Sequence, residues 1–157
     1  MSVTTFTETM RGQGFDLCHL RVRLNHPENH DQGFTGIIES GKATGPGFSG
    51  SITGGDVTIL AREGNARVMR YRLDVADLNG PVELHGVKTL RATRRLLPNP
   101  LRVWKSTTTI TLEATQNGTR ISTGTARVHV SDLLPQLCSL HGAVPRFILG
   151  FLTRVIR

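Results

Sequence analysis

A two-stranded β-ribbon over residues 101–130 restricts the fold of this chain more than any other feature. Between 104 and 115 the side chains alternate with a period of two, which places Ile110 and Leu112 on one face and polar residues on the other. The dipeptide Asn117-Gly118 follows, and it readily adopts positive φ at both central positions of a tight turn. We therefore expect a hairpin in which Gln116 faces Thr119.

The apolar phase of the ribbon changes after this turn. In the expected register Ala114 faces Ile121, so the odd-numbered residues beyond 121 should continue the apolar face. They are polar, and the even-numbered residues up to 130 are apolar instead. One inserted residue restores the phase, which predicts a β-bulge at about 123–125, where Gly124 lies. A bulge bends a sheet, and a bent sheet can close on itself.

Further strands are predicted along the rest of the chain, joined by short connections that contain glycine, proline or asparagine. They lie at 4–12, 17–24, 33–39, 57–61, 69–75 and 82–90. The apolar face of the second of these comprises Cys18, Leu20, Val22 and Leu24. About eight strands in sequential hairpins, each with one apolar face, predict an all-β, antiparallel up-and-down barrel. A barrel of this size has room for one small ligand.

Two short helices are expected to end the chain. Ser131 is the predicted N-cap of a helix of about ten residues that ends near His141-Gly142. A second, amphipathic helix is expected over 144–157, with arginines on its polar face. Its apolar stripe either packs on the barrel or lies on an anionic lipid surface. The expected contacts to a membrane or partner are Phe147, Phe151, Arg154 and Arg157. The chain is thus predicted to be one domain, 1–157, with 131–157 as a helical appendage.

The charge of the chain raises nucleic acid or an anionic membrane as partners, because 19 Lys and Arg exceed 12 Asp and Glu and give a net charge of +7. The basic residues are scattered, and one Trp and one Tyr offer little surface for base stacking. We therefore expect no nucleic-acid binding. No signal peptide or apolar run of ~20 residues is apparent. Two cysteines without metal-binding spacing predict buried thiols in a cytoplasmic protein, with peripheral association to the inner face of the membrane as an alternative.

Three segments carry a family resemblance: FTETMRG at 6–12, MRYRL at 69–73 with LHGVK at 84–88, and WKSTTT at 104–109. They resemble an accessory module that accompanies cholesterol-oxidase-like flavoproteins of the bacterial glucose-methanol-choline oxidoreductase family, outside the flavin domain. The resemblance implies a lipocalin-like (calycin-like) barrel whose neighbours act on sterol-like or other lipophilic substrates. None of the segments is catalytic, and no flavin-binding domain is apparent in this sequence, so the resemblance implies no flavin chemistry and no cofactor is expected.

Lys88 and Glu8 are the first candidates for ligand contacts. A lysine on an inward face is costly unless its ammonium reaches water, a carboxylate or a ligand, and Glu8 is the acidic residue on an inward face. We hypothesise that the two pair at one end of the barrel and orient a polar group of an apolar ligand. Alternatively, Lys88 extends to the rim. Tyr71 and Trp104 combine bulk with one donor, so each either lines a cavity or packs in the core.

The expected function is non-enzymatic binding of a lipophilic, sterol- or lipid-like small molecule. The resemblance adds a flavin-dependent, lipid-modifying oxidoreductase as a partner. One alternative is a barrel enzyme of the cyclase or isomerase type with Glu8 and Lys88 as acid and base. Another is a module that docks on a membrane or protein through its C-terminal helix. No metal site is expected, because His26 and His30 lie in HPENH and not in HExxH.

Overall fold

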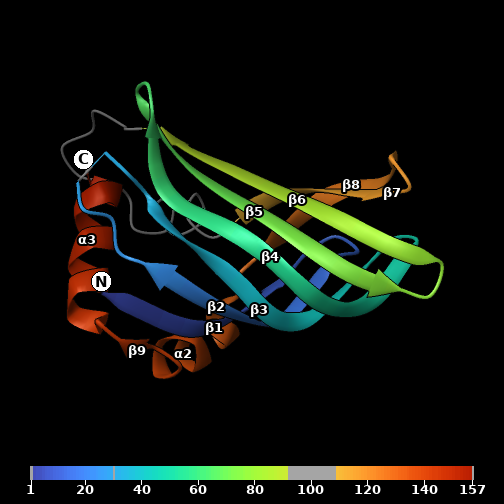
Figure 1. Cartoon of the computed structure of the whole chain (residues 1–157), viewed down its shortest axis with the longest axis horizontal. Helices are drawn as coiled ribbons and strands as arrows, with labels where there is room; N and C mark the ends of the chain where they lie inside the picture. Colours follow the sequence, from blue (N-terminus) through green and yellow to red (C-terminus); the bar gives the residue numbers. More distant parts are fainter. Residues whose placement is uncertain (1, 30, 92–108, 157) are drawn as a thin grey trace.

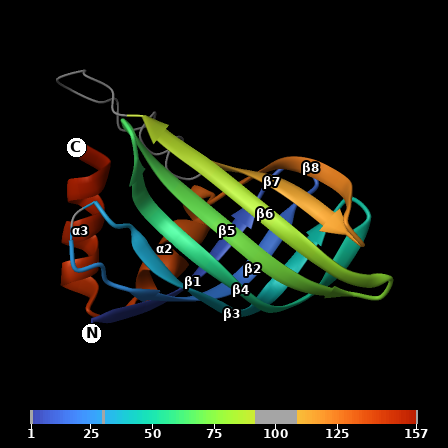
Figure 2. The same cartoon turned by 45° about the horizontal axis from the view of Figure 1, so that its top comes forward.

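The computed structural model describes residues 2–29, 31–91 and 109–156, and most of them lie in one antiparallel sheet (Figure 1). Its strands are β1 (Val3–Arg11), β2 (Asp16–Asn25), β3 (Phe34–Gly45), β4 (Phe48–Glu63), β5 (Ala66–Asp77), β6 (Gly80–Arg91), β7 (Thr109–Gln116) and β8 (Thr119–Arg127). Each strand pairs with the next, and β1 pairs with both β2 and β8, so the eight strands form a ring (Figure 2). The predicted all-β barrel is confirmed.

The interior of the ring holds the apolar faces of the strands. Val82, Leu84 and Lys88 of β6 and Tyr71 and Leu73 of β5 are buried, as the alternation predicts. The prediction for β2 is wrong at one position. Leu17 and Leu20 are both buried, whereas Cys18 is half-buried. The cause is an irregularity in the β1–β2 register beside His19, whose φ of 53° lies in the left-handed region and shifts the alternation by one residue.

The β7–β8 hairpin has the predicted turn. Asn117 and Gly118 have φ values of 52° and 76°, and Gln116 pairs with Thr119. The predicted bulge exists but lies elsewhere in β8. Ala114 pairs with Ser122 and Thr115 with Arg120, so the extra residue is Ile121 and not a residue of 123–125. The phase of the apolar face therefore changes directly after the turn.

Gly124 does not form the predicted bulge but leaves space for the ring of Phe15. It pairs with Leu112 on β7, and a Cβ atom at this position would lie 2.6 Å from the ring of Phe15. Phe15 is fully buried between β1 and β2, where it also contacts Phe48 with ring centroids 6.1 Å apart. Gly124 thus allows an aromatic ring to lie against the inner face of β8.

The seam between β8 and β1 is narrow, because the two strands share only the pair Arg11 and Arg127 among the described residues. The N-terminal half of β1 pairs instead with β9 (His141–Gly142). Between these two pairings, α2 (Val130–Cys138) lies along β1, and the backbone N–H of Thr7 donates to Ser139 Oγ at 2.8 Å. The segment 130–142 therefore covers the edge of β1 that β8 leaves free.

Two predictions for α2 are wrong. The N-cap is His129, with no side-chain capping hydrogen bond, because the helix begins at Val130 and places Ser131 inside its first turn. The helix ends at Cys138, and Gly142 belongs to β9, where a Cβ atom would lie 2.2 Å from the carbonyl oxygen of Val3. Cys138 is exposed, so the prediction of two buried thiols is also wrong.

Helix α3 (Val144–Ile156) packs against one end of the barrel (Figures 1 and 2). The ring of Phe147 contacts those of Phe6, Phe34 and Phe151, with centroids 6.1, 5.1 and 6.0 Å away. Packing on the barrel, one of the two alternatives for the apolar stripe, is therefore the observed arrangement. Neither α2 nor α3 has the length and apolar character needed to cross a membrane.

Candidate functional site

Four polar side chains from four elements interact through hydrogen bonds or charge around Glu8, and we call them the interior cluster: Glu8 (β1), Tyr71 (β5), Lys88 (β6) and Gln136 (α2). Glu8, Tyr71 and Lys88 are only 7%, 6% and 7% exposed. Strand alternation explains their orientation, since Glu8 lies between the buried Phe6 and Met10, Tyr71 between the buried Met69 and Leu73, and Lys88 two residues from the half-buried Leu90 on the same face of β6. Three of the four predicted ligand contacts thus share the interior, and the fourth, Trp104, lies outside the described residues.

Hydrogen bonds in the cluster converge on the carboxylate of Glu8. The hydroxyl of Tyr71 donates to Glu8 Oε2 at 3.2 Å. Because β1 and β5 are four strands apart in either direction around the ring, this bond crosses the interior. Gln136 Nε2 donates to Glu8 Oε1 at 3.3 Å. Both carboxylate oxygens therefore already have a donor from the protein.

Lys88 remains without a comparable partner. Its Nζ is buried, and it makes no hydrogen bond or ion pair within the part of the chain that the structure describes. The expected extension of this side chain to the rim is therefore not observed, and Glu8 and Lys88 do not form a direct ion pair. They interact at longer range, because each charge stabilises the other.

Burial controls the protonation of the cluster. It lowers the pKa of Lys88 from 10.5 to about 7, although the charge of Glu8 acts in the opposite direction. Burial also raises the pKa of Glu8, and the hydrogen bonds from Tyr71 and Gln136 and the charge of Lys88 oppose this shift. The pKa of Tyr71 lies well above its ordinary value because of burial and the adjacent Glu8. Near neutral pH, Lys88 therefore exchanges between the ammonium and the neutral amine.

Gln136 is the member of the cluster that the sequence analysis missed. It lies in a helix that we expected to be an appendage, and its partner Glu8 is 128 residues away in the sequence. The contact exists because α2 lies along the free edge of β1. No local pattern in the sequence marks this placement.

The residues predicted to contact a membrane or partner mostly face the barrel. Phe147 and Phe151 pack against the core, and Arg154 is 6% exposed. Arg154 was expected on the polar face, but its guanidinium donates to the backbone oxygens of Asn29 and Gln32 and lies 4.9 Å from the centre of the Phe34 ring. Arg157 lies outside the described residues. Among the residues whose burial is described, the exposed large apolar side chains of α2 and α3 are instead Val130, Leu134, Leu137, Ile148, Leu149 and Leu152.

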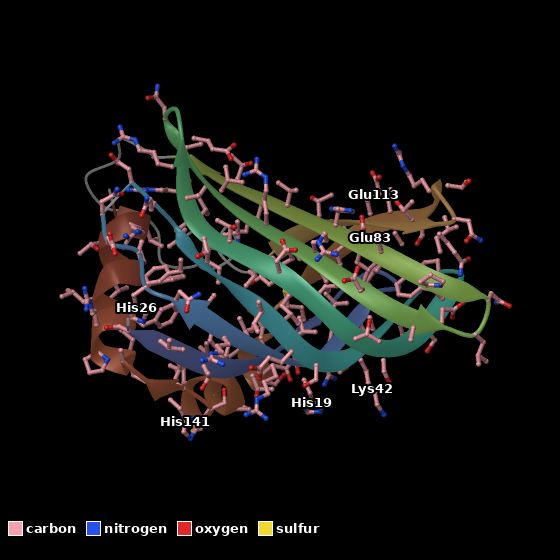
Figure 3. The ribbon with its side chains drawn as sticks, viewed as in Figure 1. His19, His26, Lys42, Glu83, Glu113 and His141 are labelled. Atoms are coloured by element: carbon pink, nitrogen blue, oxygen red, sulfur yellow. The ribbon has the colours of Figure 1, made fainter. Side chains whose placement is uncertain are left out.

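The described histidines, all but His30, show no metal-binding arrangement. His26 is buried, and its Nε2 shares a hydrogen bond with the hydroxyl of Thr4 at 2.8 Å beside the rings of Phe34 and Phe147 (Figure 3). Burial and the charges of Arg146 and Arg154 lower its pKa. His30 lies outside the described residues. Within the described ranges, no three His, Cys, Asp or Glu side chains gather in a way that would hold a metal ion.

Comparison with known proteins gives no relative for this barrel. No family model, curated protein or solved structure matches the chain. The feature of this barrel that bears most directly on function is the interior cluster, in particular Lys88 Nζ, which has no hydrogen-bond partner among the described residues.

Proposed function

We propose that the protein binds a lipophilic, sterol- or lipid-like small molecule inside its barrel and that Lys88 anchors the polar group of this ligand. The observation that carries the proposal is the buried Lys88 Nζ, which has no hydrogen-bond partner among the residues that the structure describes. A buried donor without an acceptor costs about 1–3 kcal/mol, and more when it is charged. A ligand that supplies an acceptor removes this cost, so binding is favoured at this point of the interior.

The other members of the interior cluster define the chemistry of the ligand. Glu8 accepts from both Tyr71 and Gln136, so within the interior cluster Lys88 Nζ is the donor that has no acceptor among the described residues. The surrounding inner face is apolar, with Met69 opposite Lys88 on β5. The ligand therefore combines an apolar body with one hydrogen-bond acceptor, such as a hydroxyl, carbonyl or carboxylate oxygen.

The family resemblance supports the biological setting of this proposal. The segments 6–12, 69–73 and 84–88 that carry the resemblance contain Glu8, Tyr71 and Lys88 respectively. We infer that the protein is a non-enzymatic accessory of a lipid-modifying, flavin-dependent oxidoreductase and holds a lipophilic molecule for it.

Displacement of a fluorescent apolar probe tests the binding function. N-phenyl-1-naphthylamine should bind the purified protein saturably, and palmitic acid or cholesterol should displace it. Lys88→Met should weaken displacement by palmitic acid about tenfold, which corresponds to the loss of one charge-assisted hydrogen bond. Lys42→Met is the matched control, because Lys42 lies on the exposed outer side of β3 (Figure 3). Absence of saturable probe binding to the wild-type protein would overturn the proposal.

A further inference from the structure

We infer that the ligands of this barrel include lipophilic aldehydes, to which the side-chain amine of Lys88 adds reversibly to form an imine. The inference rests on the proposed binding function and specifies the ligand chemistry at the same site. In the proposed function Lys88 holds the ligand by a hydrogen bond, whereas here it also forms a covalent bond with it.

The surroundings of Lys88 Nζ carry the inference. An amine in an ion pair stays protonated and has no free electron pair, whereas Lys88 Nζ has no contact with a carboxylate in the described part of the chain. Lys88 is buried, with an exposed fraction of only 7%. Burial disfavours the ammonium form, and with a pKa of about 7 roughly half of the side chains carry the neutral, nucleophilic amine at pH 7.

The reaction balances without a further reagent. The electron pair of Lys88 Nζ attacks the carbonyl carbon, and a proton passes from the nitrogen to the oxygen to give a carbinolamine. The hydroxyl group then leaves with a proton as water, and a carbon–nitrogen double bond forms. One aldehyde and one amine thus give one imine and one water, with no change in oxidation state, and hydrolysis reverses the sequence.

Glu8, whose charge acts on Lys88 without a direct contact, is the carboxyl group of the cluster that can take part in this proton exchange. Tyr71 and Gln136 hold its carboxyl group inside the barrel, and its charge already acts on Lys88. Because its pKa is raised, Glu8 holds a proton more readily than an exposed carboxylate does. The carboxylate form would in turn stabilise a protonated imine by charge attraction.

Reductive trapping with dodecanal tests the inference directly. Sodium cyanoborohydride converts an imine to a stable amine, so the intact protein should gain one dodecyl group near neutral pH. The amines that can react are the N-terminal α-amine and those of three lysines, Lys42, Lys88 and Lys105, and peptide mapping separates their adducts. We expect trapping at Lys88 about tenfold faster than at Lys42, and a rate that falls as the pH decreases below about 7. Lys88→Met should abolish the fast adduct, and Lys42→Met should retain it.

Equal labelling of the three lysines, or a fast adduct that persists in Lys88→Met, would overturn the inference. Peptide mapping of the wild-type protein compares the labelling of the three lysines directly, so the test remains decisive even if the Lys88→Met variant fails to fold. Dodecanol, which cannot form an imine, separates the inference from the proposed function. If dodecanol displaces N-phenyl-1-naphthylamine while dodecanal gives no Lys88 adduct, binding stands and imine formation is wrong. If neither compound binds, both proposals fail.

Discussion

Lys88 makes the stability of the fold depend on pH. Its pKa is about 7 in the folded protein and about 10.5 when the side chain is exposed in the unfolded chain. Between these values the unfolded state binds more protons than the folded state, so the free energy of unfolding rises as the pH increases from about 7 to about 10.5. Below about pH 7 both states hold the proton, and the full cost of the buried ammonium remains.

Lys88→Met should remove this pH dependence. We expect the free energy of unfolding of the wild-type protein to rise relative to that of the variant by about 3–5 kcal/mol between pH ~7 and pH ~10. Urea denaturation at a series of pH values measures the difference. Lys42→Met, at an exposed position, should follow the wild-type curve. Parallel curves for Lys88→Met and the wild type would show that the Lys88 ammonium is not desolvated in the folded protein.

At the scale of single elements, the contact between α2 and β1 is held by Ser139. Its hydroxyl oxygen accepts from the backbone N–H of Thr7, and the same hydroxyl donates to the carbonyl oxygen of Gln136 at 2.6 Å. Position 139 is the C-cap of α2, so one side chain joins the helix end to the strand edge. The same contact keeps Gln136 within reach of Glu8.

Ser139→Ala should destabilise the protein by about 1–3 kcal/mol, because the Thr7 N–H then loses its acceptor in a half-buried place. Equilibrium unfolding in urea gives the value. Ser131→Ala is the matched control in the same helix. Its side chain is exposed and does not cap α2, so we expect a change below about 0.5 kcal/mol. A larger cost for Ser131→Ala than for Ser139→Ala would contradict this view of the seam.

Local signals explain which elements could be predicted from the sequence. The Asn117-Gly118 turn depends on the φ preferences of two adjacent residues, and the inward faces of β5 and β6 depend only on alternation. The same alternation correctly placed Glu8, Tyr71 and Lys88 on inward faces. The site of the bulge was not predictable, because Gly124 is required by Phe15, which comes from a distant hairpin.

The hydrogen bonds of the interior cluster could not be predicted from the sequence, because they join residues that are far apart along the chain. The bond between Glu8 and Tyr71 requires closure of the ring, and the bond between Glu8 and Gln136 requires α2 at the seam. The burial of Arg154 similarly depends on carbonyl groups in the connection between β2 and β3. The helical periodicity of the sequence predicts that Arg154 is exposed to solvent, because the pattern contains no information about the carbonyl groups that Arg154 binds.

On the scale of the whole molecule, α3 closes one end of the barrel with aromatic side chains. Phe147 occupies the centre of this contact, between the rings of Phe6, Phe34 and His26. Residues near both ends of the described chain therefore share one cluster. The helix contributes to the core although it follows the last barrel strand in sequence.

Phe147→Ala should lower the free energy of unfolding by about 2–4 kcal/mol, because a large ring is lost from this cluster. Ile148→Ala is the matched control on the next residue of α3, where the side chain is 41% exposed, and we expect less than about 1 kcal/mol. Thermal unfolding followed by circular dichroism ranks the variants. Similar melting temperatures for the two variants would mean that α3 contributes little to the barrel end.

The single pair that joins β8 to β1 sets two like charges side by side. Arg11 and Arg127 are directly opposite each other and both exposed, while Asp132 lies 3.7 Å from Arg11 and Asp16 of β2 pairs with Arg11 from the other side. Like charges in such cross-strand positions repel, and salt weakens that repulsion. Among the described strand pairs of the ring, this line has the fewest backbone pairings, so we expect amides beside it to exchange their hydrogens with solvent sooner than those of the other strand pairs.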